Sequence, residues 1–119
     1  MIVRHFQDIE AVELMDGVKK RVVIGENAGA PTFIMRIFDI DPGKSSPYHV
    51  HPWEHEVFVL QGRAVVTDGA GDQTTLVEGD TIYIPPDEKH CLTNTGDTIF
   101  RFMCLIPTGV DESAAQNVV

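Results

Sequence analysis

The sequence predicts an all-β fold of the sandwich or barrel class. Short runs rich in β-branched and aromatic residues alternate with Gly, Pro and Asp turns along the chain. No stretch of ten or more residues carries the apolar period of an amphipathic helix. With 119 residues, the chain is long enough for one domain with a buried core. We therefore expect a single domain at 1–119, with a barrel core at about 20–107 and a loose C-terminal tail at about 108–119.

The expected strands follow one another at close spacing. Residues 1–6 alternate loosely and are interpreted as a short edge strand, whereas residues 7–19 are mixed in character. The remaining strands are expected at 21–25, 32–40, 55–60, 63–67, 74–78, 81–84, 89–93 and 98–106. In the last of these, the charged Arg101 is expected to face outward, and alternation then turns Phe102 and Cys104 inward.

The composition excludes two classes of partner. The formal net charge is −9, whereas nucleic-acid binding needs clustered Lys and Arg to neutralise phosphates. No apolar run approaches the roughly 18 residues of a membrane span. The N-terminal residues also lack the apolar core of a signal peptide. We expect a cytoplasmic protein that binds neither nucleic acid nor membrane.

Four of the five histidines form the most informative pattern. His49 and His51 are two residues apart, so they face the same side of an extended chain, and His55 keeps that parity. His90 lies in another apolar β segment and must be brought close by a neighbouring strand. Imidazole is the commonest metal ligand in proteins, and this arrangement predicts one metal site formed by all four. His5 lies outside the pattern and is expected on the surface.

Two segments resemble the two sequence motifs of the cupin superfamily. The first is Gly43-x5-His49-x-His51-x3-His55-x6-Gly62, and the second is Gly79-x5-Pro85-x-Asp87-x2-His90-x3-Asn94. The chain departs from the usual motifs in two places. His55 stands where the first motif usually has Glu, and Asp87 stands where the second usually has Gly. The resemblance implies the cupin double-stranded β-helix, a jelly-roll barrel.

The histidine at position 55 narrows the resemblance to small single-domain manganese cupins with four histidine ligands. Segments 20–25, 30–31, 51–60 and 104–107 carry the same resemblance, which covers roughly residues 18–107. It implies a divalent ion, Mn²⁺ first, although imidazole ligands suit Fe, Cu, Ni or Zn as well. Glu56 is the rival third ligand, because some cupins use His-x-His-x4-Glu. His55 is favoured as the third ligand, because it faces the same side of an extended chain as His49 and His51 and because six residues separate it from Gly62 as in the family motif.

An apolar pocket is expected beside the metal. Its predicted substrate-binding lining is Phe102, Cys104, Ile106 and Leu92, which suits an apolar or aromatic small molecule. Two roles are considered for Cys104: it packs only as a small apolar residue, or its thiol lies at the metal site. Cys91 is expected only to pack, because two isolated cysteines make no disulfide framework.

Four neutral imidazoles leave the ion its full double charge, and a six-coordinate ion keeps two open positions. We expect a metal-dependent oxidoreductase, dioxygenase-like or peroxide-using, that acts on a small organic molecule. One alternative is a non-redox isomerase, cyclase or decarboxylase in which the metal polarises a carbonyl, with Arg36, Gln73 and Thr93 as polar candidates. Another is a small-molecule binding cupin without turnover.

A homodimer is also predicted. Phe58 and Leu60 form a second apolar face on their strand, and such a face needs a second sheet or a second subunit. The resemblance implies the same, because members of this family exchange N-terminal strands.

Overall fold

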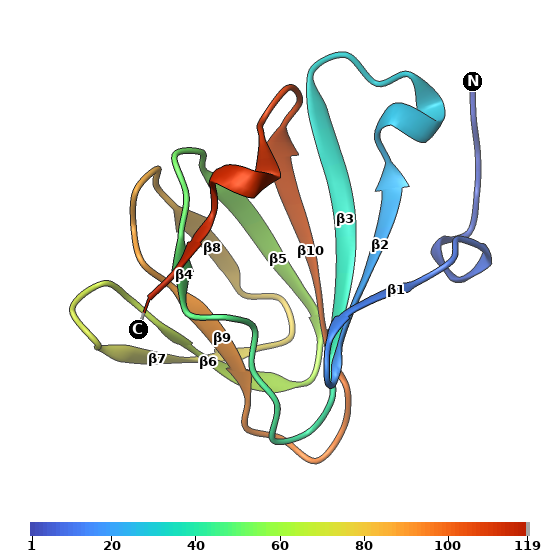
Figure 1. The fold of residues 1–119 in the computed structure, drawn as a ribbon. Helices are drawn as coiled ribbons and strands as arrows, with labels where there is room; N and C mark the ends of the chain where they lie inside the picture. The colour runs from blue at the N-terminus through green and yellow to red at the C-terminus, as the bar shows by residue number, and fades with distance from the viewer. Residues whose placement is uncertain (119) are drawn as a thin grey trace.

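The computed structural model describes residues 1–118, and almost every element in it is a β-strand. A six-stranded antiparallel sheet forms the larger layer, in the order β1-β2-β3-β10-β5-β8 (Figure 1). Its strands are β1 (Val12–Met15), β2 (Val18–Ile24), β3 (Phe33–Ile40), β10 (Phe100–Pro107), β5 (His55–Gln61) and β8 (Thr81–Ile84). The expected all-β fold is confirmed.

Two smaller sheets face this layer. One has the order β7-β6-β9 and consists of β7 (Gln73–Val77), β6 (Arg63–Thr67) and β9 (Cys91–Asn94). The other joins β11 (Gln116–Asn117) to β4 (His49–Val50). The 3₁₀ segments are η1 (Phe6–Asp8), η2 (Glu26–Ala28) and η3 (Glu112–Ala114). No helix within residues 1–118 has the length and apolar character that crossing a membrane requires.

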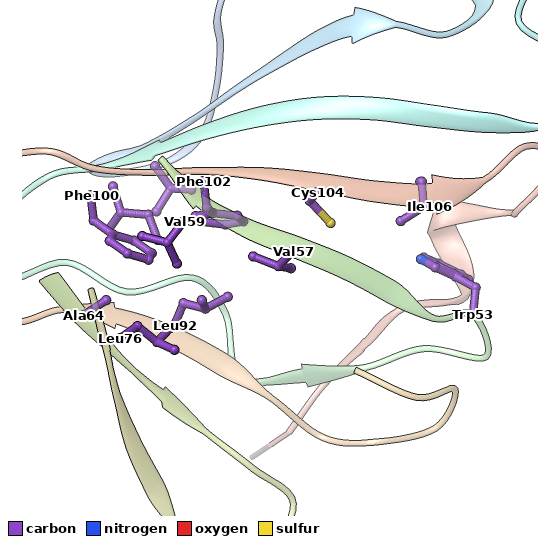
Figure 2. Close-up of a cluster of buried hydrophobic side chains, with 12 residues drawn as sticks. Trp53, Val57, Val59, Ala64, Leu76, Leu92, Phe100, Phe102, Cys104 and Ile106 are labelled. Atoms are coloured by element: carbon purple, nitrogen blue, oxygen red, sulfur yellow. The ribbon is translucent and has the colours of Figure 1, made fainter. Parts of the chain in front are cut away.

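Strand β10 shows how alternation builds the core. It pairs with β3 on one side and β5 on the other, and its burial alternates strictly along the strand. The inward row is Phe100, Phe102, Cys104 and Ile106 (Figure 2). Val57 and Val59 of β5 lie beside this row, and Leu92 of β9 lies in the opposite layer. Burying these side chains from both layers stabilises the sandwich.

The outward side of β10 also matches expectation. Arg101 lies outside the core and donates to Asp39 of β3, at 2.7 Å from Nε to Oδ1 and 3.0 Å from Nη2 to Oδ2. This bidentate geometry is the strong form of an arginine–carboxylate pair. It ties β10 to β3 on the outer face, while Phe102 and Cys104 point inward as predicted.

Both ends of the chain differ from expectation. Residues 1–5 form no strand, η1 follows at Phe6–Asp8, and the first strand lies in the stretch interpreted as mixed. The tail is not loose over its described part, because it forms η3 and then β11, which pairs Gln116 with Val50 and Asn117 with His49. Strand β1 is exposed along its whole length and therefore has no buried face to produce alternation. Strand β11 pairs with a strand far away in the sequence, which no local pattern encodes.

Candidate metal centre and cavity

The fold brings the four predicted histidines together. His49 lies on β4, His51 follows that strand, His55 begins β5 and His90 precedes β9. A backbone bridge joins His49 to His90, with N–H···O distances of 3.1 and 3.0 Å. One ring nitrogen from each of the four residues lies within 4.8 Å of the others.

Two of the rings have their tautomers set by backbone carbonyls. Nδ1 of His51 donates to the carbonyl oxygen of Trp53 at 2.8 Å, and Nδ1 of His90 donates to that of Glu88 at 2.8 Å. With the proton on Nδ1, the Nε2 lone pair is free to bind a metal. Those Nε2 atoms face the rest of the group, at 2.6 Å between His51 and His55 and 3.1 Å between His90 and His49.

This donor set fits a divalent metal ion. Nitrogen ligands lie roughly 2.0–2.1 Å from a bound zinc ion, so adjacent ligand atoms lie about 3 Å apart and opposite ones about 4 Å apart. The Nε2–Nε2 distances of 2.6 and 3.1 Å match adjacent ligands, and the whole group lies within 4.8 Å. Neutral imidazoles suit several divalent metals, so the structure supports a divalent ion without selecting manganese.

Burial keeps the group ready for a metal. Desolvation lowers the pKa of His49 to about 4 and that of His55 to about 2. These values include smaller contributions, in the same direction, from the neighbouring imidazoles and the cationic Arg36. Burial also lowers the pKa of His51 and His90. Without a metal, the group is therefore neutral near pH 7 and holds no proton that a metal must displace.

A cavity of about 720 Å³ opens from the histidine group. Aromatic side chains form much of its wall. Phe38 and Phe102 stack with ring centroids 5.0 Å apart and an interplanar angle of 6°, and Trp53 stacks on the His51 ring at 4.3 Å. A planar, largely apolar molecule can lie against these rings.

The other predicted site residues have different positions. Leu92, Phe102 and Cys104 line the cavity, whereas Ile106 is buried in the core and is not part of the lining. Glu56 is exposed on the outer face of the sheet and lies outside the histidine group, as does the exposed His5. Of the polar candidates, Arg36 lines the cavity, but Gln73 is exposed and Thr93 hydrogen-bonds Ser45.

Arg36 links the cavity wall to the metal centre. Its Nη2 donates to Sγ of Cys104 at 3.1 Å and lies 3.3 Å from Nδ1 of His55. The same His55 nitrogen lies 2.7 Å from Sγ of Cys104. Burial raises the pKa of the Cys104 thiol, while Arg36 opposes that shift. Cys104 therefore contacts the back of a candidate ligand as well as packing in the core.

The role of Glu112 was not anticipated from the sequence. Its Oε1 lies 3.3 Å from Nη1 of Arg36, although 76 residues separate the two. The strand pattern did indicate the position of Arg36. Two-residue alternation places it on the same face of β3 as Ile34 and Phe38, which is the face turned toward the interior. No comparable signal points to Glu112, which lies in the tail.

Comparison with known proteins agrees with this architecture. The family model described as Cupin domain matches residues 36–106, more than half of the chain. The peach (Prunus persica) auxin-binding protein ABP19b is 40% identical over 65 residues, which is 50% of this chain and 31% of that protein. Protein SchB of Streptomyces halstedii is 26% identical over 98 residues, covering 82% of this chain and 71% of that protein. The chain thus spans less than a third of the length of the peach relative.

A solved structure resembles the chain over its whole length. The polyketide cyclase RemF from Streptomyces resistomycificus superposes with a TM-score of 0.90 at 28% sequence identity, covering 100% of this chain and 86% of RemF. The jelly-roll barrel predicted from the two histidine motifs is therefore confirmed. On the family match and this fold, the chain belongs to the cupin domain family.

Proposed function

We propose that this protein is a metal-dependent enzyme that polarises a carbonyl group of an aromatic or polyketone-like small molecule, with ring closure as its reaction. The observation that carries the proposal is the position of the four-histidine group, which opens onto a large cavity walled by stacked aromatic rings. The full-length likeness to the polyketide cyclase RemF supports the same reaction class.

In this proposal His49, His51, His55 and His90 hold a divalent ion. When bound, such an ion supplies Lewis acidity toward a carbonyl oxygen, and four neutral ligands leave its double charge undiminished. The Phe38–Phe102 wall and Trp53 hold a planar substrate in one orientation and exclude water from it. Ring closure then joins an enol carbon to a ketone carbon, and dehydration of the resulting alcohol releases one water. No electrons enter or leave.

A metal-dependent oxidoreductase is the second candidate. It is favoured by the ligand count, because four histidines on a six-coordinate ion leave two positions for an oxidant beside a substrate. The non-redox candidate ranks first because a cationic side chain, Arg36, lines the cavity. A carbonyl-polarising site needs such polar groups more than an apolar oxidation site does.

Turnover by zinc-loaded and manganese-loaded protein under strictly anaerobic conditions separates the two candidates. With a linear aromatic polyketone as the probe, the proposed function predicts cyclised product with either metal. His51→Ala should abolish both metal retention and turnover. Activity that requires dioxygen or peroxide and disappears with zinc would instead establish the oxidoreductase. Unchanged cyclisation by the His51→Ala variant would refute a role for the metal.

A further inference from the structure

Two cations face into the cavity. On β3, alternation places Arg36 inward between Ile34 and Phe38, and only 6% of it is exposed. On β2, Lys20 pairs in register with Phe38 and lines the same cavity, with 18% of its side chain exposed. A chain with a net charge of −9 therefore has a locally cationic cavity, even before a metal binds.

The compensation of these two charges is weak. Within residues 1–118, Glu112 is the carboxylate that pairs with both, at 3.3 Å from Arg36 Nη1 and 3.9 Å from Lys20 Nζ. Its side chain is 55% exposed and belongs to the short 3₁₀ segment η3. Water screens and competes for the half-exposed Glu112 carboxylate, so another anion can displace it from Arg36 at low cost. The buried guanidinium needs stronger compensation than this.

Two residues of the cavity wall also have buried donors without a partner. Arg36 Nε and Trp53 Nε1 are buried and have no hydrogen-bond partner among residues 1–118. Both residues line the cavity. Both atoms are donors only, so any group that satisfies them must be a hydrogen-bond acceptor.

We infer that the cavity binds an aromatic carboxylate, whose anionic group takes the place of Glu112 on Arg36 and lies beside Lys20. Its ring lies against the Phe38–Phe102 stack, next to the histidine group. Arginine and carboxylate match in a planar, bidentate geometry, which makes Arg36 the selective contact and Lys20 the supporting charge. This inference deepens the proposed function and rests on the cavity being its substrate site.

Calorimetric titration of metal-free, chelator-treated protein with 2-naphthoate tests the inference without any turnover. The neutral isostere 2-naphthamide is the matched ligand, and wild type should prefer the carboxylate by at least about tenfold. Glu112→Gln should tighten naphthoate binding several-fold, since it removes the competing carboxylate. Arg36→Met and Lys20→Met should weaken it, Arg36→Met by about tenfold or more. Lys19→Met, on the exposed face of β2, is the matched control and should change nothing.

Equal affinity of wild type for the acid and the amide would overturn the inference. Unchanged naphthoate affinity in Glu112→Gln would also overturn it, and that variant alters a half-exposed residue outside the core, so it does not depend on Arg36→Met folding. The test is independent of the proposed function. Selective anion binding without metal-dependent cyclisation would refute only the proposed function. Cyclisation without anion selectivity would refute only the present inference.

Discussion

His55 determines the charge of the candidate metal centre. A carboxylate at this position would neutralise one of the two charges of a divalent ion, whereas a neutral imidazole leaves both. Its Nδ1 lies 2.7 Å from Cys104 and 3.3 Å from Arg36, so the ring is held from behind by groups of β10 and β3. Contacts of this kind orient a ligand toward its metal.

Comparison of His55→Ala with Glu56→Ala tests which residue is the third ligand. His55→Ala should lower the affinity for a divalent metal by at least about tenfold, because one of the four imidazole nitrogens that bind the ion is lost. Glu56→Ala should retain the metal, because that side chain is exposed on the outer face of the sheet. Elemental analysis of both variants beside wild type gives the answer. Full metal retention in His55→Ala with loss in Glu56→Ala would reverse the assignment.

At the scale of elements, the turn from β5 to β6 has little tolerance for a side chain. Gly62 has a φ of +89°, and a Cβ there would lie 2.7 Å from the carbonyl oxygen of Ile99 and 3.0 Å from the Cα of Phe100. The turn therefore packs directly on the backbone that leads into β10. Gly71 has a similar φ of +84° but open space around it.

These two glycines separate backbone strain from crowding. Gly71→Ala should lower the free energy of unfolding by about 1 kcal/mol, because only the left-handed conformation is penalised. Gly62→Ala should cost about 3 kcal/mol, because the new methyl group also collides with the backbone before β10. Urea denaturation of both variants measures the difference. Equal losses would show that the turn can move away from Ile99.

The C-terminal segment is an element that closes one side of the cavity. It runs from the end of β10 across to β4, where β11 pairs with the strand that carries His49 (Figure 1). Val110 and Ala115 pack against the core cluster that contains Trp53, and Ala115 and Asn117 line the cavity. The segment thus contributes both packing and a wall.

Deletion of residues 110–119 should expose the cavity and lower the free energy of unfolding by about 2 kcal/mol, from the loss of this apolar burial. Trp53 is the single tryptophan and is 8% exposed, so its fluorescence reports the change directly. Acrylamide quenching of Trp53 should increase in the truncated protein and stay at the wild-type level when the exposed residues 1–5 are deleted instead. Unchanged quenching after C-terminal truncation would contradict a covering role.

At the scale of the whole molecule, the buried histidines make the stability of the metal-free protein depend on pH. Their pKa values in the folded state lie below the ordinary 6.5, at about 4 for His49 and about 2 for His55. Below pH 6.5 the unfolded chain therefore binds more protons than the folded one. The free energy of unfolding is therefore highest above that pH, and it decreases as the pH falls toward 4.

Chemical denaturation of chelator-treated protein between pH 8 and pH 4 checks this dependence. The free energy of unfolding should be nearly constant above pH 7 and should fall as pH drops through 6 and 5. The double variant His49→Asn, His55→Asn should show a shallower fall, whereas His5→Asn, which changes an exposed residue outside the group, should follow wild type. A wild-type profile that matches that of the double variant would refute the assignment.

The outer face of the large sheet is where we predict a second copy of the chain. Phe58 and Tyr83 are 40% and 60% exposed there, on the adjacent strands β5 and β8. Sedimentation of wild type at micromolar concentration should give a dimer, and Phe58→Lys should shift it toward monomer. Val77→Lys changes an exposed apolar residue of the other sheet and should leave the dimer intact. A monomeric wild type would refute the prediction.

Much of the fold and of the histidine group could be predicted because both depend on local patterns. The two-residue alternation of apolar side chains predicted strands β3, β5 and β10. The even-numbered spacing of His49, His51 and His55 likewise predicted that they face one side of the chain. Turn residues located the ends of most predicted strands to within two positions, as expected for boundaries set by local chemistry, but β2 begins at Val18, three residues before its expected start.

Other features depend on contacts that no local pattern encodes. The pairing of Asn117 with His49 and the ion pair of Glu112 with Arg36 join residues more than sixty positions apart. The register of β11 against β4, and the position of the C-terminal segment over the cavity, depend on how the two layers of the barrel pack together. The chain by itself determined an all-β barrel with four convergent histidines. The tertiary structure decided that Arg36 and Lys20 line one cavity, because the register of β2 against β3 sets them on neighbouring strands of one sheet and the opposite layer encloses the space in front of them.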